Sequence, residues 1–403
     1  MLDLKSIKEA HKRVRGVTQH TSFTHAPLLS HLSGYDVYLK KENLQRTGAF
    51  KLRGAFNKIA LLVESGDNGG VVASSAGNHA QGVAFAAKHF GIDATIIMPD
   101  STPLTKVQGV KELGARVILS GNNYDEAYAY AHKYGQKHNL TFVHPFEDED
   151  VISGQGTVAI EMMEDITDLD AIVSPVGGGG LISGISIAAK SINSDIKIIG
   201  IASAGAPAMK ESYDLGKAID STSVRTIADG IAVRDTSPKT LDIIIKHVDE
   251  MHLVCEDEIA HAILFLLEKQ KLLVEGAGSV GVAALLNGKI NLPKGSKVGV
   301  VLSGGNIDVT MLSLIIEKGL MKSYRKMKLI VTLVDKPGSL QAFTAILINA
   351  GANIVQIDYD RTSTDLKFGD AHVTVAIETK GEDHQEEIKA GLRSANFLFR
   401  EEH

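Results

Sequence analysis

The sequence predicts an α/β protein in which parallel or mixed sheets are covered by helices, followed by a smaller module of mixed α and β elements. Short β-branched runs alternate with longer helical patterns from Tyr35 to Asn306, often with glycine at the junctions. This alternation changes near Gly319. At 403 residues the chain exceeds what one hydrophobic core usually supports, so we expect two or three domains.

The elements follow from local patterns in chain order. Residues 1–17 form an amphipathic helical pattern that lacks the apolar centre of a signal peptide. Three strand, turn and helix units follow at 70–91, 94–114 and 115–135, at a spacing of about 22 residues, which predicts a parallel sheet covered by helices. The same alternation resumes within residues 171–203 and ends with residues 297–319.

The last part of the chain has a different order. Residues 328–361 are typical of strand, turn, helix and strand, and residues 365–400 add strand, helix and strand. This βαββαβ order over roughly 75 residues predicts a compact ferredoxin-like module. The basic segment 318–328 before it is interpreted as a solvated interdomain linker rather than a nucleic-acid patch, because the chain is acidic overall.

Composition excludes several classes of partner. The chain is 44% hydrophobic and 22% charged, and its net charge of −6 gives no reason to expect nucleic acid or an anionic membrane. Residues 171–189 lack charge, but their five glycines, three serines and one proline suit a strand, turn and helix better than a membrane span. The single cysteine, Cys255, excludes an internal disulfide and is expected to be a buried thiol in a reducing compartment. We therefore expect a cytoplasmic protein without a Cys/His metal site.

A lysine and a glycine loop are the first candidates for chemistry. Lys51 stands in "GAFKLRGA" among residues too small to bury or pair it, although a solvated charge at a helix start is the alternative. Gly177 to Gly180, followed by Leu181, separate an apolar strand from a helical run. Backbone N–H groups at such a helix N-terminus can hold a phosphate, and a flexible turn is the alternative.

Two further turns carry small polar residues. In "SSAGNHAQG", from Ser74 to Gly82, exposed amides and hydroxyls could bind a carboxylate, or Ser75 or Asn78 could simply cap a helix. Ser303 ends a buried strand, at the sheet edge where ligands of open α/β sheets bind, although a turn residue is the default explanation. A lysine, a phosphate cup, an anion-binding turn and a strand-end hydroxyl are together the parts that a pyridoxal 5′-phosphate enzyme requires.

The ordered motifs resemble those of the threonine ammonia-lyases (threonine dehydratases), in the serine/threonine dehydratase family of pyridoxal-phosphate enzymes with the tryptophan-synthase β fold, fold type II. The similarity runs through "KKENLQRTGAFKLRGAFNK", "SSAGNHAQGVA", "SGQGTVAIEM", "PVGGGGLISG", "TIADGIAV", "EDEI", "VEGAG" and "SGGNID". The C-terminal module resembles an ACT domain, with "VDKPGSL" at its first turn.

The resemblance implies a domain organisation. Residues 1–320 would form the catalytic domain, with a smaller subdomain of about residues 42–148 inserted in the larger one. Residues 321–327 would be a linker and residues 328–403 an ACT-like regulatory domain. Such enzymes act on small amino acids, and a homodimer or homotetramer is expected.

The resemblance also implies residue roles. Lys51 would be the Schiff-base lysine and Ser303 would face the pyridine nitrogen, both as catalytic residues. Phe50 would lie near the cofactor ring, and Asn78 would hydrogen-bond its phenolic oxygen. The phosphate loop would comprise Gly177, Gly178, Gly179, Gly180 and Leu181, and the substrate carboxylate would bind at Ser75, Asn78 and His79. Glu275 in "VEGAG" is a possible pocket residue whose role stays open.

The implied reaction is the deamination of L-threonine to 2-oxobutanoate and ammonia, and of L-serine to pyruvate, with amino-acid regulation through the ACT-like module around residues 335–340. Ala76 stands where similar serine racemases carry a serine, which favours dehydration over racemisation. Ala202 and Ala208 stand where those racemases bind a divalent cation, so no metal site is expected there. An L-serine or hydroxyaspartate dehydratase and a non-catalytic amino-acid sensor are the alternatives. The effector (isoleucine, valine or a nucleotide) and the choice between isoleucine synthesis and threonine breakdown stay open.

Overall fold

The computed structural model describes residues 2–402, and internal contacts divide the chain into two units that meet between Asp308 and Val309. This division lies earlier than the expected boundary at residue 320, because helix α13 (Val309–Lys322) belongs to the C-terminal unit. The expected linker 321–327 contains the end of α13 and the start of strand β11 (Lys326–Val334).

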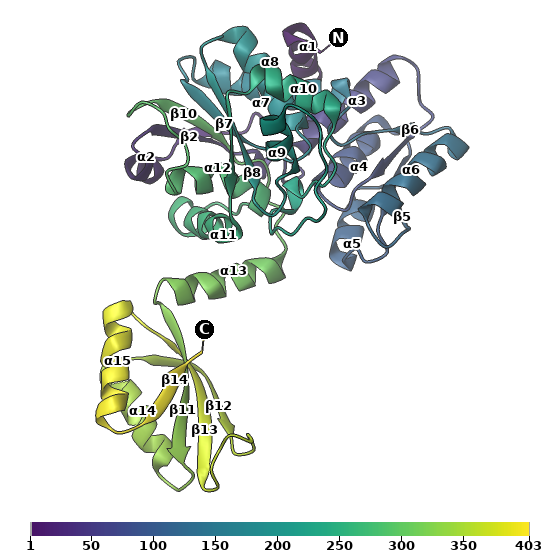
Figure 1. Cartoon of the computed structure of the whole chain (residues 1–403). Coiled ribbons are helices and arrows are strands. Elements are labelled where there is room, and N and C mark those ends of the chain that lie inside the picture. Colours follow the sequence, from purple (N-terminus) through teal and green to yellow (C-terminus); the bar gives the residue numbers. More distant parts are fainter. Residues whose placement is uncertain (1, 403) are drawn as a thin grey trace. The chain divides into compact units, whose positions relative to one another are not determined.

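A six-stranded sheet forms the centre of the N-terminal unit, as Figure 1 shows. Only its first pair, β1 and β2, is antiparallel, and every other neighbouring pair is parallel, so the expected mixed sheet is confirmed. In spatial order the strands are β1 (Phe23–His25), β2 (Asp36–Lys40), β10 (Lys297–Val301), β7 (Ala171–Pro175), β8 (Lys197–Ser203) and β9 (Glu250–Val254).

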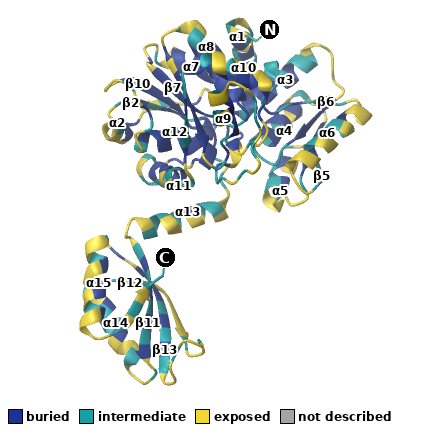
Figure 2. Ribbon diagram, in the orientation of Figure 1, coloured by how far each residue is buried: buried dark blue, intermediate teal, exposed yellow. Residues whose placement is uncertain are grey.

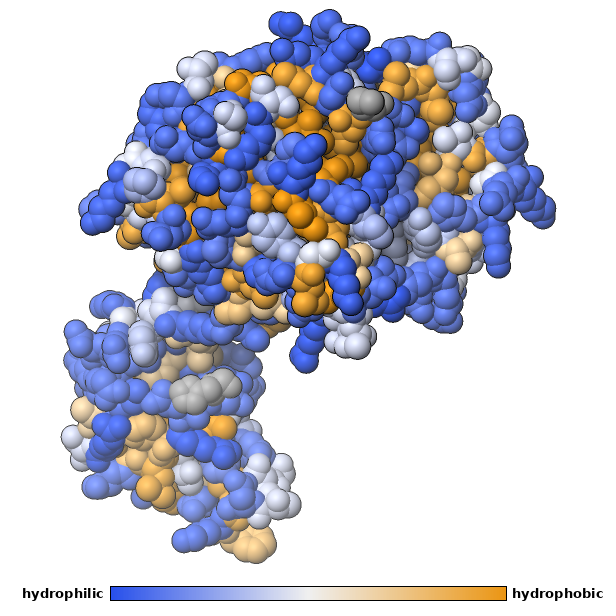
Figure 3. All heavy atoms as spheres, turned by 45° about the horizontal axis from the view of Figure 1, so that its top comes forward, coloured by the Kyte–Doolittle hydropathy of each residue, from blue (hydrophilic) through white to orange (hydrophobic). Residues whose placement is uncertain are grey.

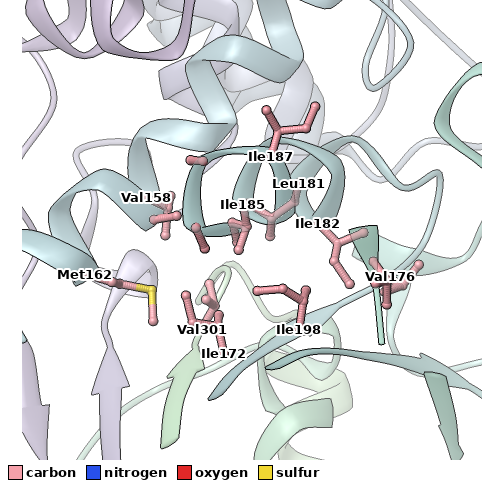
Figure 4. Packing of buried hydrophobic residues seen from close by; sticks show 14 of the residues in the cluster. Val158, Met162, Ile172, Val176, Leu181, Ile182, Ile185, Ile187, Ile198 and Val301 are labelled. Carbon is pink, nitrogen blue, oxygen red and sulfur yellow. The ribbon is translucent and has the colours of Figure 1, made fainter. Parts of the chain in front are cut away.

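Helices cover both faces of this sheet. Ile172 packs in a cluster with α7 (Glu149–Asp165) and α8 (Gly180–Ile192), and Figure 4 shows side chains of both helices lying against the strands. The next residue, Val173, points to the opposite face, where α12 (Gly276–Leu286) approaches so closely that a Cβ at Gly281 would lie 3.2 Å from it. Burial on both faces explains why all five residues of β7 are buried and why its first three are apolar.

A second, four-stranded sheet lies in sequence between β2 and β7. Its strands are parallel, in the order β5 (Arg116–Leu119), β4 (Ala94–Met98), β3 (Val71–Ser74) and β6 (Thr141–Phe142). One face packs against α3 (Lys51–Glu64) and α4 (Asn78–Phe90), and the other packs against α6 (Tyr124–His138). Helix α5 (Leu104–Glu112) connects β4 to β5.

The remaining helices of this unit are α1 (Leu4–Val14), α2 (Pro27–Ser33), α9 (Ala208–Leu215), α10 (Pro238–His247) and α11 (Glu256–Phe265). The expected N-terminal helix is confirmed as α1, which Asp3 caps. The expectation of a buried cysteine is wrong: Cys255 is exposed, because it precedes α11 as its N-cap residue. Within residues 2–402 there is no helix of the length and apolarity that a membrane span needs.

The C-terminal unit contains the βαββαβ order that the sequence predicts. The sheet is antiparallel, in the order β12 (Asn353–Asp360), β13 (Asp370–Glu378), β11 and β14 (Leu398–Glu401). Helices α14 (Ser339–Ala350) and α15 (Glu382–Ser394) share one hydrophobic cluster with the alternating apolar residues of β11 and β13. This is a ferredoxin-like fold.

Burial is unevenly distributed between the two sheets of the N-terminal unit. Figure 2 shows dark blue, buried residues concentrated in the strands and inner helices, whereas α5 and α6 carry more exposed positions. On the face drawn in Figure 3, most surface atoms of this unit belong to hydrophilic residues, with hydrophobic ones showing between them. Because polar side chains usually lie on the surface of a folded protein, those that are buried inside this unit point to a functional site.

Candidate active site

Three loops of the N-terminal unit are joined by backbone hydrogen bonds. The N–H of Phe50 donates to the carbonyl oxygen of Ser303 at 3.0 Å, and the N–H of Gly305 donates to Gly48 at 2.8 Å. The N–H of Glu275 donates to the carbonyl oxygen of Gly304 at 3.0 Å. The starts of α3 and α12 are thereby fixed at the carboxyl end of β10, the sheet edge where ligands of open α/β sheets bind.

A cavity of about 1030 Å³ opens at this edge, between the two sheets. Its lining includes every residue for which the sequence analysis predicted a site role: Phe50, Lys51, Ser75, Asn78, His79, Gly177, Gly178, Gly179, Gly180, Leu181 and Ser303. Glu275, whose role was left open, lines it as well. The structure thus brings together residues that the sequence places in five separate segments.

The glycine loop forms the N-terminus of helix α8. Gly179 has a φ of +86°, which favours glycine, and within the described residues no side chain caps the helix. A Cβ at Gly178 would lie 2.5 Å from the ring of Phe146, and one at Gly180 would lie 2.8 Å from the Phe146 carbonyl oxygen. The first N–H groups of α8 therefore stay free of side chains and carry the partial positive charge of the helix, a geometry that suits a phosphate.

A second helix N-terminus reaches the same cavity. Helix α4 begins at Asn78 after Gly77, and in the part of the chain that the structure describes it has no side-chain cap. Ser75 accepts a hydrogen bond from the N–H of Gly77 at 3.2 Å instead of capping the helix. The capping alternative for Ser75 and Asn78 is therefore wrong, and the first turn of α4 can receive an anion.

The Lys51 amine lies inside the cavity at the start of α3. Its Nζ donates to the carbonyl oxygen of Pro145 at 2.9 Å and lies 5.3 Å from the centre of the Phe50 ring. Burial lowers the pKa of Lys51 to about 8, although the nearby Glu275 carboxyl acts in the opposite direction. A lysine with this pKa loses its proton far more readily than an exposed one, as a nucleophilic amine requires.

His79 is buried beside this lysine. Its Nε2 lies 2.8 Å from the carbonyl oxygen of Val143, and because a carbonyl only accepts, Nε2 carries the proton. Burial, assisted by the charge of Lys51, lowers the pKa of His79 to about 3. The imidazole is therefore neutral, and its Nδ1, which has no hydrogen-bond partner among residues 2–402, is an acceptor. If His79 binds a carboxylate, it does so through its backbone N–H and not through its ring.

Beneath the lysine helix lies a buried network of four charged side chains. Arg53 donates to Glu42 at 2.8 Å and to Glu161 at 2.7 Å, and Lys40 donates to Glu161 at 2.6 Å. Burial disfavours the charged form of Arg53, but the two carboxylates outweigh it and raise its pKa. Because Arg53 follows Lys51 by two residues, the network anchors the first turn of α3.

The mouth of the cavity contains residues that the sequence analysis missed. Arg234 pairs with Asp125 at 2.6 Å, and Lys106 pairs with Asp229 at 3.3 Å, in both cases joining the part of the unit with the small sheet to the part with the large one. The aromatic ring of Phe146, which packs on the glycine loop, was missed too. The motif "DGIAV" was the only available signal for the loop that carries Asp229 and Arg234.

A buried amine, two uncapped helix N-termini and a strand-end hydroxyl in one cavity between a small and a large sheet define a pyridoxal-phosphate enzyme of fold type II. The glycine cradle at α8 fits the phosphate and Lys51 fits the aldehyde carbon of this cofactor.

The chain belongs to the pyridoxal-phosphate dependent enzyme family, whose signature matches residues 14–304. It is 48% identical over 400 residues to the L-threonine ammonia-lyase of Thermotoga maritima and 44% identical over 398 residues to that of Geobacter sulfurreducens, with 99% of both chains covered in each case. Among solved structures, maize serine racemase superposes with a TM-score of 0.74 at 35% identity, covering 80% of this chain and 99% of that one.

Proposed function

We propose that the protein deaminates L-threonine to 2-oxobutanoate and ammonia, and converts L-serine to pyruvate more slowly. The observation that carries this proposal is the presence of two separate anion sites around one buried amine, at the N-termini of α8 and α4. One suits the cofactor phosphate and the other suits the carboxylate of an amino acid. The two relatives described above as L-threonine ammonia-lyases support threonine as the substrate.

Lys51 has two tasks in this proposal: it holds the cofactor and then moves a proton. When bound, pyridoxal phosphate supplies an electron sink for the charge left on the α-carbon of the amino acid. The lowered pKa of Lys51 leaves its released amine able to accept the α-proton at Nζ, and the Pro145 carbonyl oxygen orients that amine. Ser303, which is 2% exposed at the end of β10, would offer a neutral hydroxyl to the pyridine nitrogen.

The substrate carboxylate would bind at the first turn of α4. The backbone N–H groups of Asn78 and His79 have no acceptor within the helix, and the hydroxyl of Ser75 lies in the same turn. The neutral imidazole of His79 contributes no donor to the carboxylate, but its bond to Val143 fixes the turn.

Ala76 supports elimination over racemisation. Racemisation needs a group that returns a proton to the opposite face of the α-carbon, and the methyl group of Ala76, which lines the cavity, has no proton to give. Because maize serine racemase shares the fold, the architecture alone does not separate the two reactions, and we assign the separation to this position.

The test is a product assay with purified protein loaded with pyridoxal phosphate. We expect 2-oxobutanoate from L-threonine to form faster than pyruvate from L-serine, and no D-amino acid from either. If L-serine or a hydroxyaspartate is turned over faster than L-threonine, that amino acid replaces threonine as the proposed substrate. Absence of keto acid from all three would refute the dehydratase proposal.

We further propose that the C-terminal unit is an ACT-type regulatory domain that binds an amino acid near its first strand-to-helix turn. In that turn Asp335 accepts hydrogen bonds from Tyr359 and from Arg361, both at 3.0 Å, which groups charged and aromatic side chains at the start of α14. The ferredoxin-like order of elements supports this assignment.

A further inference from the structure

The side-chain amide of Asn78 is held at both ends. Its Nδ2 donates to the two carboxyl oxygens of Glu275 at 2.8 and 3.1 Å, and its Oδ1 accepts from Nδ2 of Asn306 at 2.8 Å. Asn306 is itself anchored, because its Nδ2 also donates to the carbonyl oxygen of Thr47 at 2.8 Å. Since Nδ2 only donates and Oδ1 only accepts, these two neighbours permit one orientation of the Asn78 amide.

The Glu275 carboxyl occupies a space that the fold keeps open for it. A Cβ at Gly304 would lie 2.4 Å from its Oε1, and a Cβ at Gly230 would lie 3.2 Å from the same atom. The side chain is 8% exposed, and its backbone N–H is bonded to Gly304. Burial raises the pKa of Glu275 to about 7, although the hydrogen bond from Asn78 acts against this shift. A carboxyl group confined in this way stays in one place, so it can hold the amide of Asn78 in a fixed position.

We propose that Glu275 and Asn306 are positioning residues for Asn78, which they hold with its NH2 group as the donor on the cavity side. The two oxygens of the Glu275 carboxyl lie too close together to take both N–H groups, so they share one, and the other N–H can serve the phenolic oxygen of the cofactor. This inference rests on the pyridoxal-phosphate site, but not on the choice of threonine as substrate. In the flipped orientation, Oδ1 would face the Glu275 oxygens, acceptor against acceptor when that carboxyl is ionised, and Nδ2 would face the Asn306 donor in either protonation state. The two neighbours together exclude this orientation.

The test measures the dissociation constant of pyridoxal phosphate from the unloaded full-length protein by equilibrium dialysis, without substrate. We expect Asn78→Ala and Glu275→Ala each to weaken binding by about tenfold, the effect of one lost hydrogen bond to a polar ring substituent. Glu275→Gln keeps an acceptor oxygen at the same place and should restore binding to within about threefold of the parent. Glu112→Ala, an exposed carboxylate of α5, is the matched control and should leave the constant unchanged.

A variant that combines Asn78→Ala with Glu275→Ala tests whether Glu275 acts through Asn78 or contacts the cofactor directly. If Glu275 acts through Asn78, then Glu275→Ala adds less than about a twofold loss in the Asn78→Ala background. Losses that multiply, or an unchanged constant for Glu275→Ala alone, would overturn the proposal. Because binding is measured without turnover, a failure here is distinguishable from a failure of the threonine proposal.

A second variant keeps the test decisive if Glu275→Ala does not fold, which circular dichroism would show. Asn306 is exposed, so Asn306→Asp should be tolerated. It places an acceptor against Oδ1 of Asn78 and favours the flipped amide. We expect weaker cofactor binding by about tenfold and a shifted pH midpoint of the bound cofactor's absorbance. An unchanged constant and an unchanged midpoint would overturn the proposal.

Discussion

Phe50 and Ser303 are joined through their backbones, by an N–H to carbonyl hydrogen bond of 3.0 Å. The bond places the lysine that follows Phe50 opposite the serine at the end of β10, and it depends on no side chain. Substitution of either side chain should therefore alter the chemistry of the site and leave its framework in place.

Replacement of Lys51 by alanine should abolish the covalent attachment of pyridoxal phosphate and lower turnover by at least about 10³-fold, because the nucleophile and the proton acceptor are lost together. Absorbance of the dialysed protein and the keto-acid assay would measure the two effects. Lys111→Ala, an exposed lysine of α5, is the control and should retain both. Retention of the cofactor absorbance by Lys51→Ala would show that another amine holds it.

Gly178→Ala should weaken cofactor binding by more than about tenfold, because the added methyl group would lie 2.5 Å from the Phe146 ring and would displace the loop from the phosphate position. The matched control is Gly109→Ala in α5, where no described atom lies within 4 Å of the new methyl group. That variant should bind the cofactor normally and unfold at a higher temperature, since alanine stabilises a helix by about 1 kcal/mol relative to glycine. Equal binding by the two variants would contradict a phosphate loop at this position.

The rate of cofactor capture should rise with pH through a midpoint near 8. Only the neutral amine attacks the aldehyde, and the pKa of Lys51 is about 8 instead of the usual 10.5 because of burial. Below pH 7 the protonated amine predominates and capture slows by about tenfold per unit. Stopped-flow absorbance after mixing unloaded protein with pyridoxal phosphate would measure the profile. A rate still climbing at pH 10 would show that Lys51 keeps its ordinary pKa.

Much of this architecture was predictable, because its signals are local. Repeated βα units indicated parallel sheets, and glycine or small polar residues at strand ends marked Gly177 to Gly180 and Ser303 as parts of a site. The mouth of the cavity was not predictable: Lys106 and Asp125 lie on ordinary amphipathic helices, and only the fold brings them to their partners. The boundary at Asp308 was missed because α13 has the pattern of a helix that belongs to the preceding strand.

If the proposed regulation through the C-terminal unit holds, Asp335→Ala should remove the response of turnover to an added amino acid and leave basal turnover unchanged. The aspartate groups Tyr359 and Arg361 at the first turn of the C-terminal unit, and without it those side chains lose their common acceptor. Titration of threonine turnover with isoleucine and with valine would measure the response. Asp383→Ala, in the first turn of α15, is the control and should respond as the parent does. An undiminished response in Asp335→Ala would place the effector elsewhere.

The four buried charges of Lys40, Glu42, Arg53 and Glu161 sum to zero, which restricts how these positions can vary. Neutralising any one of them strands an opposite charge in the interior at a cost of roughly 3 to 5 kcal/mol, a large part of the stability of a typical domain. A wholly apolar quartet is physically acceptable, but every stepwise route to it passes through such a stranded charge. In a library of single substitutions, we therefore expect changes at each of the four positions to destabilise the protein. A variant in which all four residues are replaced by apolar ones together should fold. We therefore expect the residues at these four positions to be kept together or replaced together.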